Sequence, residues 1–228
     1  MSDKDALERM RQARGYLLPH HGLLAQMGDG VVVPYEALYF RLAAAPPTLD
    51  PLLREFLWLV ILSTIASGTA THHMVRFREA GGSEAGMEVA VRMAALPGLA
   101  DGFGFAGRSW AVAAPGFDAE AGYRRALPAC GELPAEAMAL GALLAHACKC
   151  NHWGTSLHLR DALAAVPEGI VLETLGLIIF PAGLPCFVQA AWIWRDLVRA
   201  GGVPASAAFQ AWAAAAGQDG AAGAAIAP

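Results

Sequence analysis

A repeated pattern in residues 51–113 and 136–198 constrains the fold of this chain more than any other sequence feature. When the first segment is shifted by 85 positions without a gap, His73 aligns with His158. Four further identities follow at the same offset: Ala80 with Ala165, Glu88 with Glu173, Gly98 with Gly183, and Leu99 with Leu184. Five residue types that match at one fixed offset indicate an internal duplication. We therefore predict two helical units, each of which buries its apolar face against the other.

Helix signals dominate the chain, and no β-branched alternating run indicates a strand, so we predict an all-α fold with extra N-terminal helices. Asp50 and Ser83 are the expected N-caps of helices over 51–66 and 83–95. Pro97-Gly98 is expected to turn the chain. The predicted segments are an N-terminal helical extension (1–50), a first repeat (51–113), a connector (114–134), a second repeat (135–200), and an Ala/Gly-rich C-terminal helix and loose tail (201–228).

The glycines of residues 102–107, GFGFAG, match the dinucleotide-binding fingerprint in form only. That site needs a strand before the glycines and a helix N-terminus facing the phosphates. A helical repeat precedes this segment instead. We therefore expect a glycine-rich turn without a nucleotide.

The balance of apolar and charged residues bounds the partners. The chain is 56% hydrophobic and 16% charged, against about 25% charged residues in ordinary domains. A chain with so few charged residues has too little polar surface to cover itself as a monomer, so we predict a homo-oligomer. A net charge of −4 disfavours nucleic acid as a partner.

Residues 174–194 are uncharged and long enough for a membrane span, but Pro181, Gly183 and Pro185 interrupt them. We therefore expect a buried helix pair, no membrane partner, and a cytoplasmic protein with reduced thiols.

The duplicated histidines are the first candidates for chemistry. His73 and His158 are each expected in the first turns of a helix that follows a glycine-containing break. A helix N-terminus lowers the pKa of a histidine and favours the neutral base. His72 is adjacent to His73, while His152 and Trp153 are expected to line a pocket beside His158. The alternative is that both duplicated histidines only bond to carbonyl groups in the core.

Glu55 is the acid on the most apolar predicted helix. Burial would raise its pKa and suit a role as general acid or base. The alternative role is an ion pair with an arginine of a neighbouring subunit. Glu88 and Glu173 are expected on helix surfaces.

The cysteines offer a second chemistry. A cluster of potential metal ligands alternates at period two: His146, Cys148, Cys150 and His152. On a strand this pattern would suit zinc, but on a helix it scatters the ligands around the axis, so we predict no metal. Cys148 and Cys150 cannot readily form a disulfide with each other on a helix. Cys130 and Cys186 are interpreted as small buried residues.

The same residues resemble the carboxymuconolactone decarboxylase family, which shares an all-helical fold with the alkylhydroperoxidase D-like proteins. The matching positions cover roughly residues 5–200: the segments 8–15 (ERMRQARG) and 49–55 (LDPLLRE), His73, Gly81 and Pro97-Gly98 in the first copy, and His158, Glu173 and Gly183-Leu184-Pro185 in the second. The resemblance implies trimers or hexamers. Peroxidase members carry Cys-X-X-Cys before the histidine, where this chain has Asn151 and Gly154.

Together these features predict a cofactor-free, decarboxylase-like lyase or isomerase that acts on a small carboxylated lactone or carbonyl substrate. In this hypothesis His158 carries the proton, His73 is its counterpart and Glu55 a second acid, in a pocket bordered by His152, Trp153 and His72. Two alternatives stay open. The chain could be a thiol-dependent peroxidase or reductase that uses Cys148 or Cys150, or a non-catalytic oligomeric binding protein.

Overall fold

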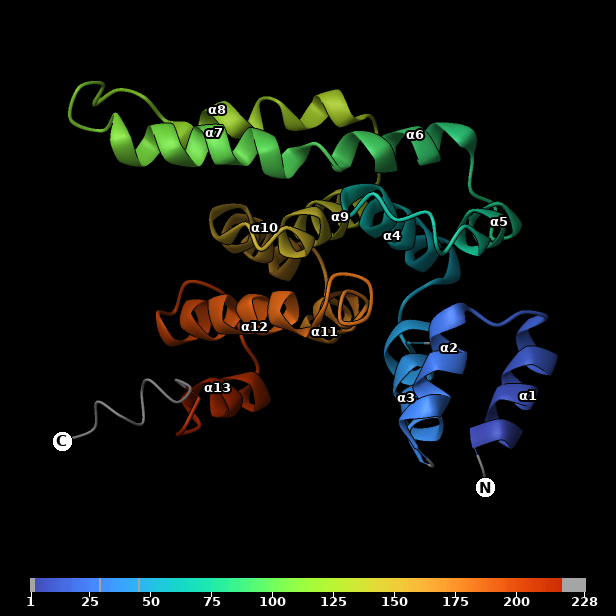
Figure 1. Ribbon diagram of the computed structural model, residues 1–228. Coiled ribbons are helices and arrows are strands. Elements are labelled where there is room, and N and C mark those ends of the chain that lie inside the picture. Colours follow the sequence, from blue (N-terminus) through green and yellow to red (C-terminus); the bar gives the residue numbers. More distant parts are fainter. Residues whose placement is uncertain (1–2, 29, 45, 219–228) are drawn as a thin grey trace. The chain divides into compact units, whose positions relative to one another are not determined.

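The computed structural model describes residues 3–28, 30–44 and 46–218, and every regular element in these ranges is a helix (Figure 1). The prediction of an all-α fold is therefore confirmed. The tail predicted to be loose begins beyond Gln218 and lies outside the described residues. The chain divides into two compact units, Met1–Pro47 and Thr48–Pro228.

The first unit is a small group of short helices. Its elements are α1 (Asp3–Arg14), α2 (Pro19–Leu24), the 3₁₀ helix η1 (Ala25–Met27), α3 (Val32–Tyr39) and the π-helix η2 (Phe40–Ala44). Ala6, Met10 and Val32 form its fully buried core. Asp3 links the start of α1 to the start of α3: its carboxylate accepts hydrogen bonds from the backbone N–H groups of Val31 and Val32 at 3.2 and 3.3 Å.

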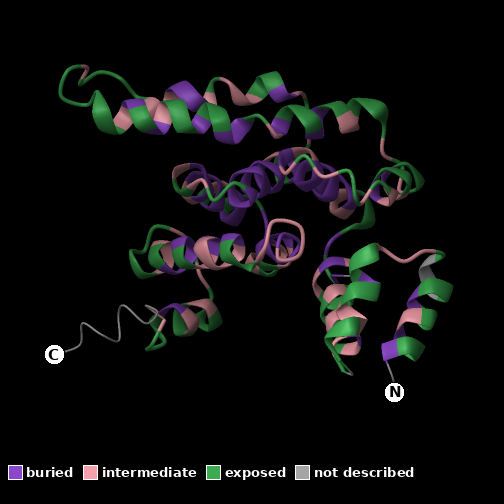
Figure 2. Cartoon of the chain, in the orientation of Figure 1, coloured by how far each residue is buried: buried purple, intermediate pink, exposed green. Residues whose placement is uncertain are grey.

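The second unit is built around three buried helices. Its elements are α4 (Pro51–Thr64), α5 (His72–Glu79), α6 (Glu84–Met93), α7 (Leu96–Ser109), α8 (Ala119–Arg124), the 3₁₀ helix η3 (Leu127–Cys130), α9 (Ala135–Cys148), α10 (His152–Ala165), α11 (Glu168–Gly176), α12 (Leu184–Arg199) and α13 (Ala207–Ala214). Figure 2 shows the buried residues concentrated on α4, α9 and α10, with α6 to α8 on one side and α11 to α13 on the other. The connector predicted for residues 114–134 thus contains helix α8 and η3.

Local sequence explains where the central helices begin. Asp50 caps α4, because its carboxylate accepts from the backbone N–H groups of Leu52 and Leu53, and Ser83 caps α6 through Gly86 N–H. Both predicted N-caps are confirmed. Helix α9 is rich in small residues, and a Cβ at Gly141 would lie 2.8 Å from Met93 Cε. The missing side chain therefore lets the layers approach closely.

The turns predicted at Pro97-Gly98 and in the glycine-rich segment 102–107 are wrong, because both segments lie inside α7. Pro97 is in the first turn of this helix, where its fixed φ is compatible with helix and no N–H is needed. The glycines give a close approach to neighbouring helices. A Cβ at Gly104 would lie 3.4 Å from the Trp153 ring, and one at Gly107 would lie 2.8 Å from Ala119 Cβ.

One helical run among the described residues, Glu84–Ser109, is long and apolar enough to cross a membrane. It includes α6 and α7, and 44% of its most apolar window is buried inside the structure. A buried core helix of a soluble protein can meet the same criteria of length and composition. The uncharged stretch that suggested a span in the sequence, 174–194, is divided between α11, a turn and α12.

Candidate functional site

Glu55 and His73 form a buried acid–base pair. Helix α4 carries Glu55, and the first turn of α5 carries His73, so the short connection between these helices brings the two residues together. His73 Nδ1 lies 2.6 Å from Glu55 Oε2, and both side chains are at most 2% exposed. Arg54 holds the other carboxylate oxygen, with Nη2 2.9 Å from Glu55 Oε1. The carboxylate is therefore fixed on both sides.

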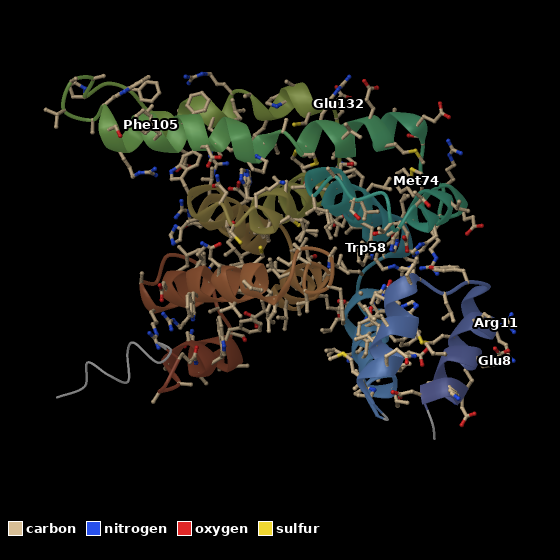
Figure 3. The ribbon with its side chains drawn as sticks, viewed as in Figure 1. Glu8, Arg11, Trp58, Met74, Phe105 and Glu132 are labelled. Atoms are coloured by element: carbon tan, nitrogen blue, oxygen red, sulfur yellow. The ribbon has the colours of Figure 1, made fainter. Side chains whose placement is uncertain are left out.

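The second ring nitrogen of this pair makes no hydrogen bond to any residue that the structure describes. This atom, His73 Nε2, is also buried. The indole of Trp58 stacks on the His73 ring, with centroids 4.2 Å apart and planes inclined by 13°, and the ring of His72 lies at the same centroid distance. Trp58 projects from α4 (Figure 3). These neighbours fix the plane of the imidazole without occupying Nε2.

Burial keeps the imidazole neutral, and the neighbouring His73 and Arg54 groups keep the Glu55 carboxylate ionised. Burial lowers the pKa of His73 more than Glu55 raises it, and Arg76 and Arg54 lower it further. Burial alone would raise the pKa of Glu55, but the His73 and Arg54 contacts outweigh burial and hold it below its ordinary value. The expected rise in the Glu55 pKa is therefore wrong. With the proton on Nδ1, held by the carboxylate, Nε2 carries the lone pair of a base.

His158 lies in a different, closed group. The hydroxyl of Tyr123 on α8 is 2.9 Å from His158 Nε2 and 2.7 Å from His146 Nε2. The two imidazoles are stacked, with centroids 5.1 Å apart and planes 13° apart. Tyr123 and His146 are 0% exposed and His158 is 1% exposed. This group shares no residue with the Glu55–His73 pair.

The tautomers of both histidines follow from the Asp161 carboxylate and from the single proton of the Tyr123 hydroxyl, which can be donated to only one of them. His158 Nδ1 lies 3.0 Å from Asp161 Oδ2, too poorly aligned for a hydrogen bond but close enough for strong electrostatic contact. A lone pair facing a carboxylate at this distance would be repelled, so Nδ1 carries the proton and Nε2 accepts from Tyr123. His146 Nε2–H then donates to the Tyr123 oxygen. His146 Nδ1 is left as a buried lone pair without a partner in the described part of the chain.

Asp161 and Arg124 connect the closed group to the surface. The two terminal nitrogens of the Arg124 guanidinium, Nη1 and Nη2, donate to the Asp161 carboxylate at 3.0 and 2.9 Å. Burial raises the pKa of Asp161, but His158 and Arg124 lower it to about 2. Burial and the nearby His158 lower the pKa of His146 to about 3, so its ring is neutral at pH 7. Burial also raises the pKa of Tyr123 strongly, so the phenol keeps its proton.

The predicted position of His158 near a helix N-terminus is wrong. Helix α10 begins at His152 directly after the Asn151 cap, which places His158 in the second turn. Its neighbours, rather than helix-terminal N–H groups, set its chemistry. Gly154 is required in the first turn, because a Cβ there would overlap the His146 ring.

His152 and Trp153 line a cavity of about 190 Å³ at the start of α10, together with Asp101, Arg108 and Cys150. This cavity does not contain His158, although the Trp153 ring contacts Tyr123 edge-on at a centroid distance of 5.4 Å. His152 and Trp153 thus line one cavity together, as predicted. The cavity lies at the outer side of the closed group and does not reach His158. His72 instead accompanies His73.

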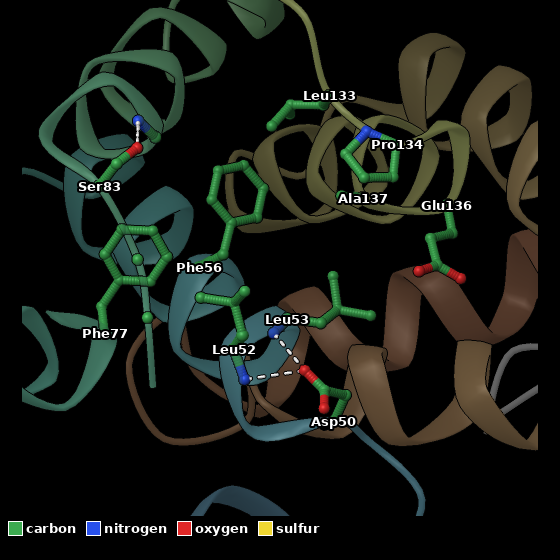
Figure 4. A pocket seen from close by; sticks show the side chains of 13 residues that line it. Asp50, Leu52, Leu53, Phe56, Phe77, Ser83, Leu133, Pro134, Glu136 and Ala137 are labelled. Atoms are coloured by element: carbon green, nitrogen blue, oxygen red, sulfur yellow. Dashed lines mark hydrogen bonds between the residues drawn. The ribbon is translucent and has the colours of Figure 1, made fainter. Parts of the chain in front are cut away.

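A larger, mainly apolar cavity of about 250 Å³ lies beside the N-terminal ends of α4 and α9 (Figure 4). Phe56 and Phe77 form one part of its wall, and Leu133 and Pro134 another. None of the six predicted site residues lines it. Among the residues that the structure describes, no group of three or more His, Cys, Asp or Glu side chains could hold a metal ion.

Several residues of these groups carried no sequence signal. Tyr123 and Arg124 lie in the connector outside both repeats, and Asp161 lacks an acidic equivalent in the first copy. Their roles follow only from three-dimensional contact. The i, i+3 spacing of His158 and Asp161 on a helix was the one signal available.

Comparison with known proteins finds no relative of this chain. No protein-family model matches it, no curated protein matches it, and no solved structure matches it.

Proposed function

We propose that this chain is an enzyme in which Glu55 and His73 carry out acid–base catalysis without a cofactor. The observation that carries this proposal is His73 Nε2, a buried basic nitrogen with no protein partner in a ring whose other nitrogen is held by a carboxylate. A carboxylate that orients an imidazole and leaves its second nitrogen free is the arrangement that general bases use. His73, rather than His158, is thus the proton carrier.

The substrate class follows from the surrounding charges. Arg54 and Arg76 are close enough to lower the pKa of His73, and a substrate carboxylate would be attracted to the same cations. We therefore propose a small carboxylated lactone or carbonyl compound. In an isomerisation, Nε2 would remove a proton beside the carbonyl and return it to another carbon. In a decarboxylation, Nε2 would first take up one proton from solvent as the substrate carboxylate binds; carbon dioxide would then leave, and the imidazolium would deliver that proton to the resulting enolate.

The family resemblance and the homo-oligomer belong to the same proposal. Helices α4 to α7 and α9 to α12 follow one another in the same order, with His73 and His158 both buried, which supports the duplication. Large apolar side chains exposed on the second unit, such as Val91 (61%), Phe105 (52%) and Leu184 (57%), support burial between subunits. We propose a trimer or hexamer located in the cytoplasm.

A non-catalytic role is the second candidate, and it applies to His158 only. His158 is enclosed, and its Nε2 is occupied by Tyr123. We propose that the second copy keeps its histidine for stability.

Turnover of a substrate panel tests the proposal. Unsaturated lactone carboxylates and β-keto acids are followed by ultraviolet absorbance and by carbon dioxide release. His73→Gln removes the base and Glu55→Gln removes the orienting charge, and each should lower kcat by about 10²–10⁴-fold. Met74→Ala changes an exposed residue of the same helix (44% exposed, Figure 3) and should keep full activity.

Helical circular dichroism of each variant separates lost catalysis from lost folding. Full activity in a folded His73→Gln variant would refute the assigned base. No turnover of any panel member by the folded wild-type protein would refute the substrate class.

A further inference from the structure

Two cysteines far apart in the sequence meet outside the histidine groups. Cys150 Sγ lies 2.6 Å from Cys186 Sγ, although both thiols are free. This separation is closer than an ordinary contact between non-bonded sulfur atoms and slightly longer than the roughly 2.05 Å of a disulfide. Cys186 is buried, as predicted, but its sulfur also contacts that of Cys150.

The backbone around Cys150 holds its thiol in place. Cys150 follows α9 with a φ of +50°, in the left-handed region that glycine normally occupies after a helix. Its N–H donates to Ala147 O, and Asn151 N–H donates to His146 O, which closes the helix end. Ala66 adopts the same conformation after α4. The turn therefore does not need a thiol in order to form.

The two sulfurs differ in access. Cys150 is exposed and lines the cavity of about 190 Å³ that Arg108 and His152 also line. Cys186 is buried in the first turn of α12, 3.8 Å from the carbonyl oxygen of Cys148. Burial and its contact with Cys150 raise the pKa of Cys186 to about 11, so this thiol keeps its proton at neutral pH. A small reagent can therefore reach the exposed Cys150 thiol, whereas the Cys186 thiol is buried next to it.

We propose that Cys150 and Cys186 form a redox-active pair that exchanges with low-molecular-weight disulfides through the cavity beside α10. The thiolate of Cys150 attacks one sulfur of the external disulfide, forms a mixed disulfide and releases one thiol. Cys186 then attacks Cys150 Sγ, its proton passes to the second departing thiolate, and the intramolecular disulfide is complete. Two protein thiols are oxidised while one external disulfide is reduced to two thiols. This activity is independent of Glu55 and His73.

Equilibration of the full-length protein in buffers of reduced and oxidised glutathione tests the pair. Free thiols are then blocked, and the protein is digested with trypsin without reduction. Lys149 separates the two neighbouring cysteines, so Cys148 and Cys150 fall in different peptides. We expect a single cross-linked product that joins the peptide beginning at Cys150 to the peptide containing Cys186, with a mass lower by two hydrogen atoms.

Three variants separate the possible outcomes. Cys150→Ser changes an exposed position and should abolish the cross-link. Cys186→Ser should stop the reaction at Cys150 bound to glutathione. Cys148→Ser is the matched control and should form the normal cross-link. Four thiols that stay free at every glutathione ratio, a cross-link containing Cys148, or a cross-link only between two chains would overturn the proposal.

Discussion

Replacement of Tyr123 by phenylalanine isolates the contribution of one buried hydroxyl to the second unit. The oxygen bridges His146 Nε2 at 2.7 Å and His158 Nε2 at 2.9 Å. The phenyl ring would keep its edge-on packing against Trp153 and against both imidazoles. The substitution therefore removes the hydrogen bonds without opening a large cavity.

The expected cost follows from what the two histidines lose. Their rings are stacked, so neither in-plane Nε2 can turn to bond the other. One buried N–H and one buried lone pair are left unpaired, at about 1–3 kcal/mol each. A total of about 2–6 kcal/mol corresponds to a Tm lower by about 4–24 °C for a chain of this size.

Thermal and urea unfolding followed by circular dichroism measure this loss. Tyr35→Phe is the matched control, because it removes the same hydroxyl from an exposed hydrogen bond to His20; its Tm should change by about 2 °C or less. Imidazole nitrogen NMR of the wild type should show the proton of His158 on Nδ1 and that of His146 on Nε2. If Tyr123→Phe unfolds at the same temperature as the control, the closed network does not stabilise the fold.

Three further predictions concern stability. The pKa of His146 falls from 6.5 to about 3 on folding, so below pH 6.5 the unfolded chain binds a proton that the folded chain does not. Stability should then decrease on acidification by roughly 4–5 kcal/mol between these pH values; urea unfolding at pH 4–7 should show this slope, and His146→Asn should flatten it. Gly154→Ala should lower the free energy of unfolding by about 1–3 kcal/mol, because the new Cβ would displace the His146 ring. Gly169→Ala has open space around it and should stabilise α11 by about 0.5–1 kcal/mol. The urea midpoints of the two variants test this contrast. Glu173→Ala should cost about 1–2 kcal/mol, since the Glu173 carboxylate accepts from Thr48 N–H, Thr48 Oγ1 and Leu49 N–H; hydrogen exchange at the two amides should accelerate, and unchanged exchange would contradict this role.

Local sequence rules located most of the helices, because caps and apolar spacing act over a few residues. Asp50 and Ser83 were identifiable as N-caps, and α13 begins after the Ser206 cap near the helix expected there. The failure in α7 has a physical cause. Glycines that normally break a helix are accepted at positions such as Gly107, where a Cβ would lie only 2.8 Å from Ala119 Cβ. That close approach depends on tertiary packing.

The site was less accessible to sequence reasoning, because its bonds join segments far apart in the chain. Glu55 and His73 were both identified, but their hydrogen bond depends on how α5 folds back on α4. The sulfur pair joins Cys150 to Cys186, which no spacing rule connects. The duplicated glutamates show the same limit: Glu88 pairs with Arg92 on a surface, whereas Glu173 binds the backbone before α4.

The difference between the two copies explains why we propose His73 rather than His158 as the proton carrier. Both histidines are buried, and each has a carboxylate beside Nδ1. Only His158 also has Tyr123 against Nε2, and this tyrosine comes from the connector, which lies outside the repeat. The connector thus closes the second imidazole, while Nε2 of His73 has no partner within residues 3–28, 30–44 and 46–218. Chemistry at a histidine requires a nitrogen that the fold leaves free, and for this reason the first copy carries the proposed catalytic base.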